Sequence, residues 1–94
     1  MSGHIVRTEG ICGGKPRIRD HRVRVQDIAY YSERCGWTPD RIATELELTL
    51  GQVHAALSYY FDNIDEIRRD IRKGRDLREQ LARQASSKVL APPP

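Results

Sequence analysis

Arginine and lysine side chains crowd the stretch GGKPRIRDHRVRV at residues 13–25, where they could bind phosphate groups. Paired glycines beside a lysine suggest a nucleotide-binding loop, but that loop requires GxxxxGK[ST] between a strand and a helix. Here Pro16 follows the lysine and forces Lys15 toward an extended conformation. The alternation of aliphatic and charged residues after Pro16 predicts a strand. We therefore reject a nucleotide cradle and expect no cofactor.

A β-hairpin is the structure that this alternation predicts. With a two-residue turn at Asp20-His21, three pairs of residues would face each other: Arg19 with Arg22, Ile18 with Val23, and Arg17 with Arg24. Four arginines would then share one face, and like charges directly opposite one another destabilise a hairpin unless an anion binds there. A solvated charged face, DNA phosphate and an acidic partner all remain open.

Charge is unevenly distributed along the 94 residues, whose formal net charge is +3. Residues 1–25 hold six Lys or Arg against two acids, residues 26–61 hold two against five, and residues 62–94 hold eight against six. Phosphate contacts supply most of the affinity of DNA-binding proteins. Any contact with DNA must therefore use charge from one of the two ends of the chain.

Three helices are predicted between these ends, at 26–36, 38–46 and 49–61, which is the arrangement of a helix-turn-helix. Gly36 ends the first, and Thr38 with Pro39 starts the second. Thr49 and Gln52 have the spacing of a capping box at the start of the third. As the reading helix, 49–61 would present Thr49, Gln52 and either His54 or Ser58 to bases. It carries no Lys or Arg.

A long charged helix is expected over residues 62–84, followed by a disordered tail at 85–94 that ends in three prolines. Its apolar residues form a thin stripe, interrupted at Gly74: Ile64, Ile67, Ile71, Leu77 and Leu81. This helix could fold back on the core or could lie in a groove of a partner protein. In the second case, deleting everything after Asn63 would leave a folded domain.

Composition indicates one small domain with a thin core, for which a partner chain would add stability. Cys12 and Cys35 are far apart and are expected to be buried or half-buried thiols, and the three histidines lack metal-ligand spacing. The N-terminus lacks the apolar stretch of a signal peptide, so we expect a cytoplasmic protein. No nucleophile–base or carboxylate pair indicates an enzyme.

GGKPRIRDHRVRVQDIAYY followed by GWTPDRIATELELTLGQVHAALSYY resembles a small bacterial GGKP-motif domain that was first catalogued as one of unknown function. The resemblance covers residues 5–61. Asp20-His21 replaces the Gly-Thr of that family, and Arg24 replaces its proline. Members are similar to VapB-type antitoxins with a homeodomain-like unit and are paired with PIN-like ribonuclease toxins. The resemblance implies a homodimer joined partly through N-terminal strands.

The sequence therefore predicts a mainly α fold, with N-terminal strands or a hairpin, a three-helix unit and a long C-terminal helix. The expected function is that of an antitoxin that inhibits a PIN-like ribonuclease and binds operator DNA. The alternative is a freestanding DNA-binding regulator, and a neighbouring gene for a PIN-like protein would separate the two. The expected DNA-binding residues are Lys15, Arg17, Arg19, Arg22, Arg24, Thr49 and Gln52. The expected toxin-binding residues are Ile67, Arg68, Ile71, Arg72, Arg75, Leu77 and Leu81, with an arginine of this helix reaching the toxin's metal-binding acids.

Overall fold

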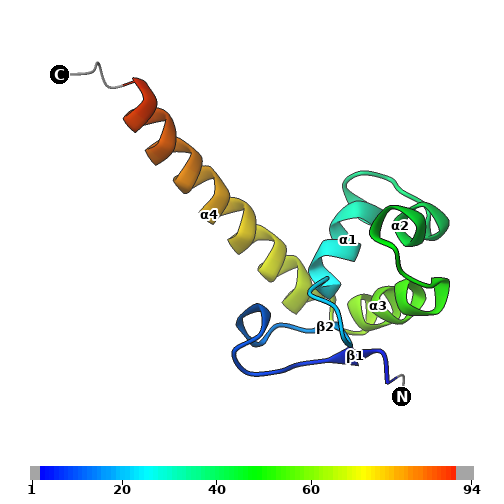
Figure 1. The fold of residues 1–94 in the computed structure, drawn as a ribbon. Helices are drawn as coiled ribbons and strands as arrows, with labels where there is room; N and C mark the ends of the chain where they lie inside the picture. The colour runs from blue at the N-terminus through cyan, green and yellow to red at the C-terminus, as the bar shows by residue number, and fades with distance from the viewer. Residues whose placement is uncertain (1–2, 91–94) are drawn as a thin grey trace.

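The structure is a computed structural model that describes residues 3–90, with the side chains of residues 3–84. Four helices, two short strands and a 3₁₀ turn follow one another along the chain (Figure 1). The elements are β1 (Ile5–Val6), η1 (Cys12–Gly14), β2 (Arg17–Ile18), α1 (Val25–Glu33), α2 (Pro39–Leu46), α3 (Leu50–Asp62) and α4 (Ile64–Leu90). The predicted mainly α fold with N-terminal strands is confirmed.

Local capping signals set the starts of α2 and α3. The Thr38 hydroxyl accepts a hydrogen bond from Arg41 N at 3.2 Å, and Pro39 occupies the first turn of α2. Thr49 Oγ1 accepts from Gln52 N at 3.1 Å, while Gln52 Oε1 accepts from Thr49 N at 2.8 Å. The predicted capping box is therefore present, and it satisfies backbone donors that the first turn of a helix leaves unpaired.

The core lies where α1, α2 and α3 meet beneath β2. Every helix contributes fully buried aliphatic or aromatic side chains to it, including Ile28, Ile42, Val53, Tyr60 and Ile67. Ile18 of β2 and Val25 at the start of α1 close the same cluster from the N-terminal side. The strand segment therefore belongs to the hydrophobic core of the helical unit.

The N-terminal segment forms a different sheet from the one predicted. β2 pairs antiparallel with β1, with Ile5 opposite Ile18 and Val6 opposite Arg17. Of the predicted hairpin, the Arg17–Arg24 bridge and the bond from Ile18 N to Val23 O at 2.9 Å are present.

The turn of this hairpin also differs from the prediction. The bond from His21 N to Ile18 O at 3.0 Å centres it on Arg19 and Asp20, and Asp20 has a φ of 65°. Arg19 N donates to His4 O, so Arg19 does not pair with Arg22. His4, directly before β1, accepts the hydrogen bond from the backbone of Arg19. The pairing between the two arms of the hairpin therefore ends at Ile18.

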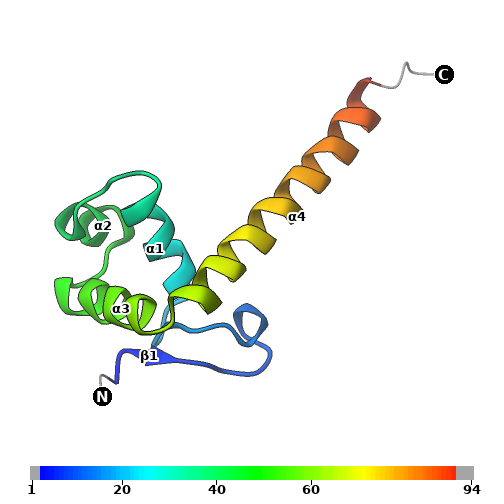
Figure 2. The ribbon, with the colours of Figure 1, turned by 180° about the vertical axis from the view of Figure 1, so that it is seen from behind.

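Helix α4 begins against the core and then leaves it. Its first turns pack on α1 and α3, and the remainder projects from the body of the molecule in both views (Figures 1 and 2). The helix continues to Leu90, so the prediction that structure ends at 84 is wrong for residues 85–90, whereas 91–94 lie outside the described residues. Across residues 3–90, no helix is both long and apolar enough to cross a membrane.

Candidate functional site

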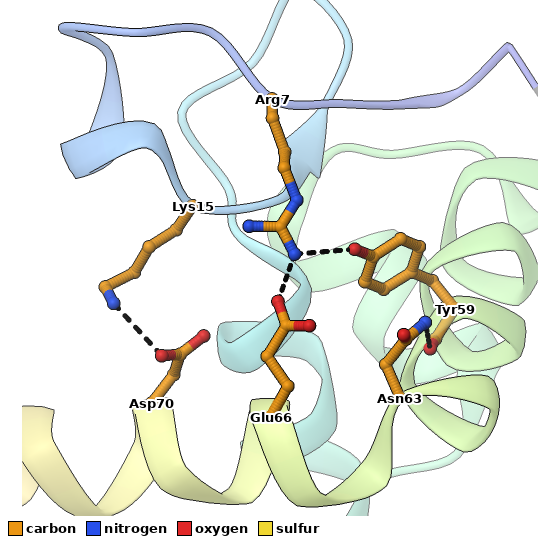
Figure 3. Close-up of polar contacts among 6 residues, drawn as sticks. All are labelled: Arg7, Lys15, Tyr59, Asn63, Glu66 and Asp70. Atoms are coloured by element: carbon orange, nitrogen blue, oxygen red, sulfur yellow. Dashed lines mark hydrogen bonds and ion pairs between the residues drawn. The ribbon is translucent and has the colours of Figure 1, made fainter.

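Two cations of the N-terminal segment are used inside the fold. Lys15 Nζ lies 3.1 Å from Asp70 Oδ1, and Arg7 donates to the Tyr59 hydroxyl at 2.8 Å and to Glu66 (Figure 3). The hydrogen bonds to Tyr59 and then to Glu66 raise the pKa of Arg7. Both cations therefore fasten the N-terminal segment to α3 and to the start of α4. Lys15, predicted to bind DNA, already has an acidic partner.

Arg17 is a component of the protein interior, with only 8% of its surface exposed. Its guanidinium donates to Ile18 O at 3.2 Å, His21 O at 3.0 Å and Thr8 Oγ1 at 3.1 Å. These acceptors replace water at the two terminal nitrogens, whereas Nε is buried without a hydrogen-bond partner among the described residues. Arg17 thus ties the turn to the strand, and the prediction that it faces a DNA phosphate is wrong.

The remaining arginines of the hairpin do not form one face. Arg24 makes two hydrogen bonds with Asp27, at 2.9 and 3.1 Å, and these bonds raise its pKa. Arg19 is exposed and donates to Gly3 O at 2.6 Å. Arg22 is exposed and has no ion pair within residues 3–84. The predicted four-arginine surface is therefore wrong, because two of its members are bound within the fold.

Helix α3 offers few groups to nucleic acid. Thr49 and Gln52 are engaged with each other's backbone in the capping box, which leaves the Gln52 amide nitrogen as a donor. The outer face carries Leu50 and Phe61, 45% and 58% exposed, together with His54 and Ser58. A reading helix without lysine or arginine cannot supply cationic phosphate contacts itself.

The predicted toxin-binding residues of α4 divide into two groups. Ile67 is fully buried and cannot anchor a partner, so that prediction is wrong, whereas Ile71 is half-buried against the same core. Leu77 and Leu81 are 56% and 54% exposed on the projecting half. The apolar stripe predicted from the sequence therefore packs on the protein's own core before Gly74 and is exposed after it.

Two of the predicted toxin-binding arginines, Arg68 and Arg72, lie on the side of α4 opposite to these leucines. Arg68 and Leu77 are separated by about two and a half turns, as are Arg72 and Leu81, so each pair points in opposite directions. Arg75 lies near Asp76, with 3.8 Å between Nε and Oδ1. A single shallow groove could not bind both faces of α4 at once.

Arg68 and Arg72 line a cleft of about 320 Å³ together with Arg34, which caps the C-terminal end of α1. Glu33, Tyr60 and Ile71 complete its walls. Arg68 Nε donates to the Tyr60 hydroxyl at 3.0 Å, and this bond raises the pKa of Arg68. The sequence analysis missed Arg34, because no local pattern connects the end of α1 with the second turn of α4.

The cysteines do not combine into a site. Cys12 is half-buried as predicted, whereas Cys35 is exposed, contrary to the prediction, and both are free thiols. Among the residues that the structure describes, no group of three or more His, Cys, Asp or Glu side chains is placed to hold a metal ion.

Comparison with known proteins finds a family model and a solved structure that are similar to this chain. A family model described as "Protein of unknown function (DUF433)" matches residues 5–60. The chain is also similar to the crystal structure, at 2.00 Å resolution, of a DUF433 member protein from Anabaena variabilis ATCC 29413. The TM-score is 0.67 and the identity 33%, over 72% of this chain and 67% of that one. A search of curated proteins gives no match.

Proposed function

The chain belongs to the DUF433 family, and on this premise we propose that it is the antitoxin of a type II toxin–antitoxin pair. In this proposal the projecting half of α4 binds and inhibits a PIN-like ribonuclease. The protein also binds operator DNA as a homodimer. The role is one of binding, with no reaction catalysed by this chain.

The observation that supports the toxin-binding role is the projecting half of α4. A charged helix that packs on nothing is marginally stable in water. Leu77 and Leu81 nevertheless stand about one turn apart on one side of it, both more than half exposed. Apolar anchors at this spacing are typical of a helix that binds in a groove of another protein. The partner would complete the packing that the protein's own core gives to the first half.

Among the arginines predicted to reach the toxin's metal-binding acids, the proposal assigns this role to Arg75. Arg68 and Arg72 line the cleft against α1, whereas Arg75 is not among the residues that line this cleft, and its side chain is 50% exposed. A guanidinium forms paired hydrogen bonds with a carboxylate, so Arg75 suits an acidic pocket. The proposal therefore combines two leucine anchors with one arginine on a separate side of the helix, as a deep groove requires.

Inhibition of the PIN-like ribonuclease that the proposal pairs with this chain tests the proposal. The full-length chain should inhibit RNA cleavage, and Leu77→Asp with Leu81→Asp should weaken inhibition at least tenfold. Gln80→Asp with Ala82→Asp is the matched control, because it adds the same charge about 100° to either side of Leu81. If the leucine variant inhibits as well as the control, toxin binding through this face is refuted and the freestanding regulator is the better description.

A further inference from the structure

Most of the positive charge in the first 25 residues is paired with acids or buried inside the fold, and this changes where an anion can bind. Lys15, Arg7 and Arg24 face Asp70, Glu66 and Asp27, and Arg17 is buried. The cleft between α1 and α4 differs. Its three arginines have no ion pair within residues 3–84, and Glu33 is the one carboxylate among its lining residues. The lining residues therefore carry a net charge of +2.

We propose that this cleft, formed by Arg34, Arg68 and Arg72, binds the phosphate backbone of duplex DNA. The inference deepens the DNA-binding half of the proposed function and is independent of the toxin. It moves the phosphate contact from the N-terminal hairpin, where the sequence predicted it, to the junction of α1 and α4.

Arg68 is held in place before any ligand arrives. Tyr60 is almost fully buried, and its hydroxyl accepts from Arg68 Nε at 3.0 Å. The bond fixes the side chain through Nε and leaves both terminal nitrogens free to donate. A planar guanidinium that presents two terminal nitrogens matches the oxygens of a phosphate. Because the side chain is already ordered, less entropy is lost when the anion binds.

The row of arginines continues along α4 beyond the cleft. Arg68, Arg72 and Arg75 follow one another on nearly one face, with rises of about 6 and 4.5 Å along the helix axis. A straight row of cations suits a continuous polyanion, and duplex DNA carries one negative charge for every ~1.7 Å of its axis. The outer face of α3 offers no lysine or arginine, and this row supplies cations that α3 lacks for DNA binding by the helical unit.

Fluorescence anisotropy with a 24-base-pair duplex of arbitrary sequence tests the cleft, since binding to phosphate does not depend on sequence. Affinity is measured over a series of salt concentrations. Arg34→Ala with Arg68→Ala and Arg72→Ala should reduce the slope of log affinity against log salt by about 0.9 for each phosphate that the variant no longer neutralises, so by up to ~2.7 for each protomer bound. Arg22→Ala with Arg69→Ala and Lys73→Ala removes the same charge from exposed positions outside the cleft and should leave most of the slope.

A thermal melt followed by circular dichroism verifies that each variant is folded. If the triple variant unfolds, Arg34→Ala with Arg72→Ala provides the same test and keeps the bond between Arg68 and Tyr60. Equal reductions of the slope in the cleft and control variants would mean attraction by net charge alone, and the inference would be wrong.

Three further outcomes also overturn the inference and separate it from the proposed function. Unchanged binding by the cleft variant refutes the cleft and leaves the DNA-binding half standing. Wild-type protein that does not bind DNA at low salt refutes both. A cleft variant that keeps DNA binding but no longer inhibits the ribonuclease would assign the cleft to acidic groups of the toxin.

Discussion

Individual residues in this protein depart from the behaviour of their residue type, and Arg17 is the clearest case. It lies within a run of alternating charged and aliphatic residues, in which charged side chains are expected to face solvent. In the structure it is buried and donates to two backbone carbonyls and to Thr8. Its removal would leave buried acceptors unpaired, at a cost of about 1–3 kcal/mol for each group. Arg17 therefore supports the strand and turn of the N-terminal segment.

Gly74 lies inside α4, and its surroundings do not sterically require glycine. A Cβ atom at this position would lie 3.5 Å from both Arg78 Nη1 and Gln26 Nε2, which is ordinary van der Waals contact. Glycine in a helix interior costs about 0.5–1 kcal/mol relative to alanine. We therefore expect Gly74→Ala to raise the free energy of unfolding by about that amount in a urea titration. Gly36→Ala is the contrasting control, because a φ of 67° strains any residue with a Cβ. A decrease of stability in Gly74→Ala would show that α1 and α4 need the closer approach.

Glu47 is a residue with a side chain in a conformation that favours glycine. It adopts a left-handed conformation, with φ 55° and ψ 46°, at the end of α2. Glycine is the residue that most often occupies this position after a helix. Glu47→Gly should therefore stabilise the protein by about 1 kcal/mol, which for a domain of this size raises Tm by about 4–8 °C. Glu45→Gly, inside α2, should lower Tm instead. Equal shifts in the two variants would contradict the conformational explanation.

At the scale of elements, α4 consists of two segments that differ in their contacts with the rest of the protein. Its first turns bury Ile67 and supply Glu66 and Asp70 to the cations of the N-terminal segment. The exposed leucines begin only at Leu77. The first segment is therefore part of the domain, and the second is available to another molecule.

Truncation separates the two segments. A chain that ends at Asn63 forgoes the burial of Ile67, worth about 1.5–3 kcal/mol, together with both ion pairs, in a domain whose total stability is of the order of 5–15 kcal/mol. We expect it to show no cooperative thermal unfolding, which replaces the sequence-based expectation of a folded remainder. A chain that ends at Asp76 should unfold cooperatively but fail to inhibit the ribonuclease. Cooperative unfolding of the chain ending at Asn63 would show that α4 is dispensable for the core.

Elements with strong local signals could be predicted from the sequence, whereas contacts between distant segments could not. The starts of α2 and α3 follow from Thr38, Pro39 and the Thr49–Gln52 box, because each cap involves residues within one turn. Lys15 forms its ion pair with Asp70, which lies in another element, and no local sequence pattern identifies Asp70 as its partner. The Arg34 cleft was missed for the same reason.

For the whole molecule, a small body with a projecting helix leaves several apolar surfaces without an internal partner. The axes of the molecule measure 57 by 29 by 24 Å (Figure 1). Beside β1, a groove of about 440 Å³ is lined by Ile5, Val6, Ala55 and Tyr59, among others. β1 pairs with β2 on one edge, and within the described residues no strand occupies its other edge. A second copy of the chain would cover both surfaces, in agreement with the proposed homodimer.

Multi-angle light scattering at micromolar concentration should therefore give a mass of twice 10.8 kDa. Ser58→Arg places a cation at the exposed rim of the groove and should shift the mass toward that of the monomer. Thr44→Arg adds the same charge on an exposed position of α2 and should leave the dimer intact. A wild-type mass near 10.8 kDa would rule out the dimer at this concentration.

The ion pairs between the N-terminal segment and α4 also determine when the protein can finish folding during its synthesis. Lys15 pairs with Asp70, 55 positions later, and Arg7 pairs with Glu66, 59 positions later. A ribosome adds about 5–20 residues per second, so these two contacts with α4 form only after most of the chain has emerged, later than the pairing of β1 with β2. Nascent chains arrested before Glu66 leaves the ribosome should be cut readily by protease in the first 25 residues. Chains arrested well beyond Asp70 should resist, and production of a stable protein would then depend on completing translation.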